Sequence, residues 1–253
     1  MLVREIVISL VIFASLMLSA FGTLLLYDKL PKRYHHEDTA DVVRQIASLF
    51  VVMTSLVLGL MVNSAKNTFE EVDHNVHVFA TEIILLDRTL RKYGPETDET
   101  RQHLRVYVNW AITATAPPGD PLVMGDHVSE RLLSAVGDGI DAILPSTEEQ
   151  RNILQDAREE FRSVLRLRWV LLEQADGALA MPFLAMVVAW LVFVFATFGY
   201  RAPRNLVVAA SLLMAAGLIA GSIYFILDMD VPFKGFIQVP DTPMRRALAE
   251  LEH

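Results

Sequence analysis

Residues 62–93 read VNSAKNTFEEVDHNVHVFATEIILLDRTLRKY, and this stretch decides the fold. Its apolar and small residues recur in alternating steps of three and four, the heptad spacing of a helix that packs along its length. The repeating residues are Val62, Ala65, Phe69, Val72, Val76, Phe79, Ile83, Leu86, Leu90 and Tyr93. Neither Pro nor Gly occurs before Gly94, so the stretch predicts one unbroken helix about 46 Å long, at 1.5 Å per residue.

The repeat begins inside one of four segments that contain no Asp, Glu, Lys or Arg. These segments cover residues 6–27, 45–65, 177–200 and 205–227. A helix of about 20 residues spans the hydrocarbon core of a bilayer, and a charge in its middle costs roughly 3 kcal/mol. The chain has 253 residues, of which 53% are apolar and only 21% charged, and its mean hydropathy is +0.37. Because the other residues are too few to bury four such helices in a soluble core, we expect four transmembrane spans.

The polar region between the second and third spans is expected to form a helical stalk outside the membrane. Residues 63–174 carry 12 Lys and Arg against 19 Asp and Glu, a net charge of −7. Two short helices are predicted over residues 100–115 and 128–143, separated by a loop rich in Pro and Gly at 116–121. The stalk is therefore acidic and solvated.

A longer helix is predicted to return the stalk to the membrane. It starts with a capping box, because Ser146 is followed three residues later by Glu149. Apolar residues then recur every three or four positions along the predicted helix. They are Leu154, Ala157, Phe161, Leu165, Trp169 and Leu172.

The expected fold is an all-α membrane protein with four transmembrane helices in two hairpins and a long antiparallel helical stalk between spans 2 and 3. The predicted parts are residues 1–65 for the first hairpin, 66–175 for the stalk, 176–228 for the second hairpin and 229–253 for a C-terminal tail. This connectivity places both termini and the stalk on one side of the membrane. The loop at 28–44 lies on the other side.

Composition and motifs exclude several classes of function. The net charge of −8 and the absence of a Lys/Arg face argue against nucleic-acid binding. Without cysteine there is no disulfide, thiolate nucleophile or Cys-ligated metal. The sequence has no glycine-rich phosphate loop and no GxSxG motif, so we expect no enzyme and no cofactor. No ionisable residue lies in mid-span, which disfavours a proton-relay pump.

Span 2 carries small and polar residues at helical spacing, on one face. They are Ser48, Val52, Ser55, Gly59, Asn63 and Lys66. In a symmetric ring this face would line a narrow conduit, with Lys66 favouring anions at one mouth. The alternative is that small residues merely let membrane helices pack closely.

Two further groups of polar residues are candidates for function. Glu70, His74 and His77 follow span 2 at spacings that suit a weak metal site, a pH-responsive face or an ordinary solvated face. Asp228 and Asp230 lie at the end of span 4, where they would meet Lys66 or Arg168 of the stalk. We expect these charges to anchor the helices or to take part in gating.

Three segments resemble the signature of a bacterial membrane family of unknown function called bestrophin-like. They are AKNTF at 65–69, VHVFA at 76–80 and LLDRTLRKYG at 85–94. The run LDMDVPFKG at 227–235 resembles the ending of the same family. Where bestrophins themselves carry an acidic calcium-binding run, this chain has FIQV at 236–239, so the resemblance does not imply calcium gating.

The resemblance implies a homo-oligomeric channel for chloride or other small anions, with span 2 around the axis and the stalk continuing the pore. It also implies a multi-pass protein of the bacterial inner membrane with a cytoplasmic stalk. Lys and Arg near the membrane divide equally between the two sides, so the positive-inside rule does not decide the orientation. The alternative function is a membrane-anchored scaffold or sensor whose stalk binds a partner without ion conduction.

Overall fold

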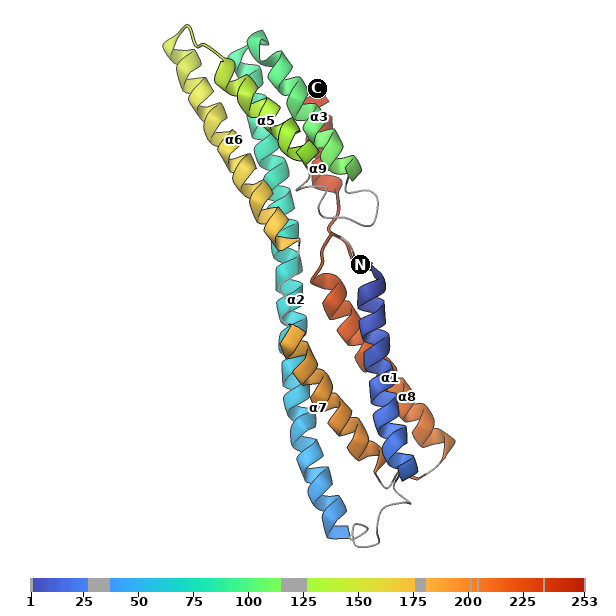
Figure 1. Cartoon of the computed structure of the whole chain (residues 1–253). Coiled ribbons are helices and arrows are strands. Elements are labelled where there is room, and N and C mark those ends of the chain that lie inside the picture. The colour runs from blue at the N-terminus through green and yellow to red at the C-terminus, as the bar shows by residue number, and fades with distance from the viewer. Residues whose placement is uncertain are drawn as a thin grey trace. The chain divides into compact units, whose positions relative to one another are not determined.

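The computed structural model describes residues 2–26, 37–114, 127–175, 181–200, 202–203, 205–233 and 235–252. The described residues form α-helices and one short 3-10 helix, and none of them is in a β-strand (Figure 1). The chain divides into two compact units. We call Met1–Asn67 with Ala178–Asp230 the membrane unit, and Thr68–Gly177 with Val231–His253 the stalk unit. The predicted loop at 116–121 lies outside the described residues.

The membrane unit contains four helices that are long and apolar enough to cross a bilayer. They are α1 (Leu2–Leu26), the first part of α2 (Glu37–Tyr93), α7 (Met181–Gly199) and α8 (Leu206–Met229). Helix α1 packs against both α7 and α8. The four predicted spans are therefore present by length and composition, while their arrangement as two hairpins stays a prediction.

Helix α1 approaches α7 most closely where two small residues meet. A Cβ added at Gly199 would collide with the carbonyl group of Ala20 and with the hydroxyl of Thr23. A hydrogen bond also links α1 to α7: the Oγ of Ser19 donates to the carbonyl oxygen of Val192 at 2.7 Å. Small residues and an interhelical hydrogen bond replace the hydrophobic effect as packing forces inside a membrane.

Helix α2 is continuous over 57 residues, from Glu37 to Tyr93. The predicted unbroken helix through Asn63 is therefore confirmed. The helix starts inside the segment 28–44, which was predicted to be a loop, so that prediction was wrong for residues 37–44. The reason is that apolar composition marks where a membrane span ends, whereas a helix continues as long as its backbone hydrogen bonds do.

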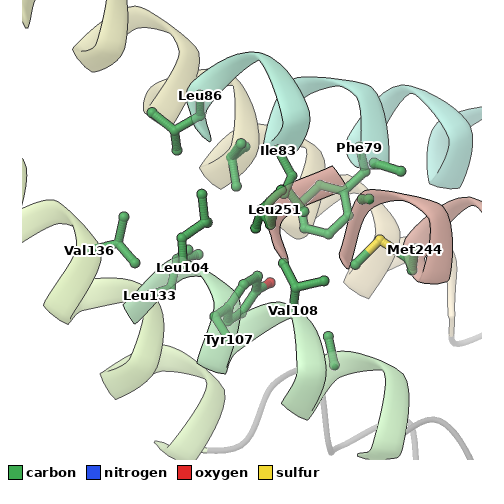
Figure 2. Close-up of a cluster of buried hydrophobic side chains, with 14 of the residues drawn as sticks. Phe79, Ile83, Leu86, Leu104, Tyr107, Val108, Leu133, Val136, Met244 and Leu251 are labelled. Carbon is green, nitrogen blue, oxygen red and sulfur yellow. The ribbon is translucent and has the colours of Figure 1, made fainter. Parts of the chain in front are cut away.

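The stalk unit is built around the heptad repeat of α2. It also contains the 3-10 helix η3 (Pro95–Thr97) and the helices α3 (Asp98–Ala114), α5 (His127–Ala142), α6 (Glu148–Gln174) and α9 (Thr242–Glu252). Figure 2 shows Phe79, Ile83 and Leu86 of α2 facing side chains from α3, α5 and α9. The seven repeat positions from Val72 to Tyr93 are buried. Earlier in the repeat, Val62 is exposed and Phe69 is half-buried.

The family-like segment at 85–94 has a structural explanation in this unit. Leu86, Leu90 and Tyr93 are core residues, and Asp87 is a buried ion-pair partner. Gly94 ends the helix with a φ of 133°, which side chains rarely tolerate. The Oγ1 of Thr97 then donates to the carbonyl oxygen of Leu90 at 2.6 Å and satisfies one of the terminal carbonyls of α2.

Helix α6 differs from its prediction at both ends. Its N-cap is Thr147, whose hydroxyl accepts from the backbone N–H of Gln150 at 3.1 Å, so the predicted Ser146–Glu149 box was wrong by one residue. Near its C-terminus Arg168 is buried and Trp169 is 62% exposed, the reverse of the prediction. A count of apolar residues misses this because the stem of an arginine is itself apolar and can be buried.

The predicted C-terminal tail contains helix α9, which the sequence analysis missed. Met244, Ala247 and Leu251 lie on one face of α9 and belong to the core of the stalk unit. Their spacing of three and four residues is that of one face of a helix and would have predicted α9 from the sequence. The helix is short, and its burial depends on a groove that only the folded unit provides.

Candidate pore-lining face and charged residues

The six residues predicted to line a pore are all exposed along the membrane part of α2. They are Ser48, Val52, Ser55, Gly59, Asn63 and Lys66. On the opposite side of the same helix, Ala47, Thr54, Met61 and Ala65 are buried. Helix α2 therefore packs on its own chain with one side and leaves the small, polar side uncovered.

Aromatic contacts hold the buried side of α2 against α7. The ring centroid of Phe50 lies 6.2 Å from that of Trp190 and 5.1 Å from that of Phe193, in tilted and edge-on geometries. Such geometries are favoured between aromatic rings. These contacts determine which face of α2 is turned away from the rest of the membrane unit.

Gly59 serves no close packing within the chain. A Cβ added there would have no atom of another residue within 4 Å, in contrast to Gly199 at the contact between α1 and α7. Close helix packing within one chain therefore does not explain the glycine at this position. It applies only if a second chain covers this face.

Large apolar residues flank the polar stripe and are equally uncovered. Leu56 is 66% exposed, Leu60 is 59% exposed, and Leu49 is exposed to a similar degree. Contiguous apolar surface of this kind is covered by lipid or by another protein chain. The Ser48 hydroxyl donates to the carbonyl oxygen of Gln45 at 2.7 Å and is satisfied within the helix. The amide of Asn63 is poorly suited to lipid, since an amide without partners is costly in hydrocarbon.

The metal candidates Glu70, His74 and His77 are exposed on α2. The Nδ1 of His77 lies 2.9 Å from the backbone oxygen of Asp73 and 3.7 Å from its carboxylate, one turn earlier on the same helix. Across the residues that the structure describes, no three His, Asp or Glu side chains come together in a way that could hold a metal ion.

The gating or anchoring candidates lie in different units. Asp228 and Asp230 are buried at the C-terminal end of α8, and the hydroxyl of Tyr224 lies 3.4 Å from the carboxylate of Asp228. Arg168 is buried in the stalk unit, with its guanidinium 5.4 Å from the ring centre of Trp169. A contact of Arg168 or Lys66 with the two acids stays a prediction.

With the uncovered face of α2 described, comparison with known proteins identifies the family. A family model for the Bestrophin-like domain matches residues 14–244. The chain belongs to the Bestrophin-like domain family. The match includes every predicted pore-lining residue and both acids at the end of α8.

A solved structure supports the fold of this bestrophin-like protein. It is the crystal structure of a point mutant of a bacterial bestrophin homologue from Klebsiella pneumoniae, with a TM-score of 0.65 and 13% sequence identity. The similarity covers 96% of this chain and 97% of the other. At this identity the likeness shows the fold alone. A search of curated proteins finds no match.

Sequence reasoning missed one charged cluster of the bestrophin-like chain. The carboxylate of Asp87 accepts hydrogen bonds from the side chain of Arg101 on α3 and from that of Arg91, each at 2.9 Å. Asp87 and Arg91 are four residues apart, so their spacing alone predicts only an ordinary ion pair on the helix surface. The partner Arg101 lies across a turn, and no local spacing indicates it.

Proposed function

We propose that this bestrophin-like protein is a homo-oligomeric membrane channel that passes chloride or other small anions through a pore lined by α2. One observation carries the proposal. The small, polar face of α2 is uncovered in the single chain, while the opposite face is packed on α7 and its neighbours. The proposal includes no catalytic activity and no cofactor.

A ring of chains would turn this face into a conduit. Cyclic symmetry repeats the same face around an axis, so each ring of hydroxyls would replace part of the hydration shell of an ion. The flanking leucines would then lie against neighbouring chains or lipid. This arrangement accounts for both the polar stripe and its apolar borders.

Charge at the stalk end of the span supports anions over cations in the proposed pore. Asn63 and Lys66 are the last two members of the stripe, and both are exposed. A ring of lysines near a narrow mouth raises the local concentration of anions and lowers that of cations. We place the protein in the bacterial inner membrane, with the stalk unit in the cytoplasm.

A scaffold or sensor function is the second candidate. It is favoured by large apolar side chains that are exposed on the stalk unit, where Leu144 is 87% and Trp169 62% exposed. Such residues suit a protein partner. A stable monomer after purification would support this function, whereas a closed ring of more than two chains supports the channel.

Cysteine substitution tests the pore, because the chain contains no cysteine of its own. Liposomes with Ser55→Cys or Gly59→Cys protein should lose or change chloride flux when a charged thiol reagent is added. Thr54→Cys is the matched control, since Thr54 is the buried neighbour on the same helix. Labelled Ser55→Cys and Gly59→Cys channels with unchanged flux would refute the pore lining. Intact oligomers without chloride or potassium flux would favour the scaffold.

A further inference from the structure

The stalk unit contains a cavity of about 640 Å³ between the start of α3 and the end of α5. A volume of this size is typical of pockets that hold small ligands. The wall of the cavity is formed by the C-terminal end of α2, η3, the first turns of α3, the last turns of α5 and the loop that leads into α6. Every residue that lines it belongs to the described part of the chain.

Two buried residues of this wall carry hydroxyl groups without hydrogen-bond partners. Tyr93 is 7% exposed and Thr100 is 4% exposed, and neither hydroxyl bonds to any residue in the described ranges. A Cβ added at Gly139 would meet the Oγ1 of Thr100 first, so this hydroxyl points across to α5. The buried Nδ1 of His103, which also lines the cavity, has no partner either. Buried polar groups without partners are unusual in native proteins, and a bound ligand would satisfy them.

The exposed edge of the cavity is acidic. Glu96, Glu99 and Asp138 line it with exposed side chains, and we call these three residues the acidic rim. Among the described residues, none of the three carboxylates has an ion-pair partner. No Lys or Arg lines the cavity, and Arg101 of α3 is bonded to Asp87 instead. The C-terminal turn of α5 adds partial negative charge, so the charges around the cavity favour a cation.

Apolar side chains form another part of the wall. They include Ile143, which is half-buried, and Leu144, which is 87% exposed. Within the described residues, no three His, Asp or Glu side chains are placed to hold a metal ion. A ligand that combines positive charge with an apolar stem therefore fits this wall better than a metal ion does.

We propose that the cavity binds a small organic cation. Its ammonium or guanidinium group lies between the acidic rim and the unpartnered hydroxyls, and its apolar stem lies against Ile143 and Leu144. Ammonium and guanidinium groups have only donors, so they pair with carboxylate and hydroxyl oxygens, and the bonds to carboxylates are the stronger ones. The site lies within the stalk unit, and the proposal does not rest on ion conduction.

Agmatine is a suitable probe, because an alkyl stem separates its guanidinium group from its ammonium group. Isothermal titration calorimetry on the purified full chain should show saturable binding that weakens as sodium chloride is added, since salt screens the exposed rim. The control ligand is γ-guanidinobutanoate, in which a carboxylate replaces the ammonium group. It should bind at least about tenfold more weakly. No binding of agmatine at millimolar concentration, or equal binding of the two compounds, would overturn the site.

Substitutions in the rim test which groups hold the cation. Glu99→Gln and Asp138→Asn each remove one charge and should weaken agmatine binding about tenfold or more, whereas Tyr93→Phe removes only a hydroxyl and should have a smaller effect. Glu159→Gln is the matched control, because it removes an exposed carboxylate of α6 that does not line the cavity. Equal weakening in Glu159→Gln and Asp138→Asn would show a general charge effect and refute the site. Thermal unfolding without agmatine identifies any variant that is misfolded.

A peptide distinguishes a free small molecule from the basic side chain of a protein partner. The acetylated tripeptide amide Leu-Arg-Leu carries the same guanidinium group between apolar residues. If the cavity takes a small cation, agmatine should bind at least as tightly as the peptide. Much tighter binding of the peptide, lost in Asp138→Asn, would assign the cavity to a protein segment and overturn the proposal.

Discussion

The carboxylate of Asp87 lies 2.9 Å from the Nε of Arg101, and the Asp87 side chain is only 2% exposed. This contact joins the last turns of α2 to the first turn of α3 across Gly94. Asp87→Asn would leave Arg101 with only its longer 3.4 Å contact to the exposed Asp98, so it should destabilise the protein by about 3 kcal/mol, the lower end for a broken buried pair. Thermal unfolding of the purified full chain would measure the change.

The control for this substitution is Asp98→Asn. Asp98 contacts the same arginine at 3.4 Å, but its side chain is 67% exposed. Exposed pairs contribute at most about 1 kcal/mol, so this variant should unfold close to the native temperature. Equal effects of the two variants would contradict a role for burial.

Gly199 and Gly59 should respond in opposite ways to alanine. At Gly199 the new methyl group collides with the carbonyl group of Ala20. Overpacking of this kind should lower the free energy of unfolding by about 1–3 kcal/mol. At Gly59 the methyl group meets open space, so Gly59→Ala should not lower the stability of the chain and should instead change oligomerisation or flux. Parallel melting curves and liposome flux measurements distinguish the two effects.

Glu160 should make the stability of the stalk unit depend on pH. Burial raises its pKa, the hydrogen bond from Thr89 opposes the rise, and the charges of Asp156 and Glu82 add to it. The folded state then binds the proton more tightly than the unfolded state, so stability increases as pH falls through the folded pKa and levels off below the unfolded pKa.

Glu160→Gln should therefore unfold at a higher temperature than the native chain near neutral pH and show a flatter profile on acidification. Glu159→Gln is the control, because Glu159 is exposed and immediately precedes Glu160 on α6. A raised carboxyl pKa falls in the range of roughly pH 4 to 7. If the unfolding temperature of the native chain does not change across this range, Glu160 does not have this role.

Lys66 should influence ion selectivity if α2 surrounds a pore. Lys66→Glu replaces a ring of positive charge with negative charge, which should shift the reversal potential in a potassium chloride gradient toward that of potassium. Lys92→Glu, at the other end of the same helix and exposed, should produce a much smaller shift. The same shift in both variants would indicate a general surface-charge effect rather than a ring at a pore mouth.

Helix α9 should be necessary for a stable stalk unit. Leu251 is fully buried, so Leu251→Ala should cost about 2–5 kcal/mol. Glu250→Ala, which removes only the exposed ion pair with Arg88 at 3.4 Å, should cost less than about 1 kcal/mol. A melting temperature of Leu251→Ala equal to that of the native chain would show that α9 does not stabilise the stalk unit.

Much of the fold follows from properties that are local in the sequence. The spans were predictable because their hydropathy is high over 20 residues, and α2 was predictable because its repeat is unbroken from Val62 to Tyr93. The exposure of the stripe from Ser48 to Lys66 was also consistent with its helical spacing. The start of α6 and the existence of α9 were less predictable, since one-residue caps and short amphipathic helices depend on what they pack against.

The sequence by itself determined that the chain is helical, that four of its segments are long and apolar enough to cross a membrane, and that one helix continues from the second of them into the stalk. These features depend on the hydropathy of a segment and on the spacing of its apolar residues. Both act through the local backbone and through neighbours in the sequence. Only the tertiary structure decided that Arg101 meets Asp87, that Arg168 rather than Trp169 faces the core, and that Thr100 and Asp138 line one cavity. Such pairs depend on how separate helices pack, because the side chains involved are far apart in the sequence and become neighbours only when the core forms.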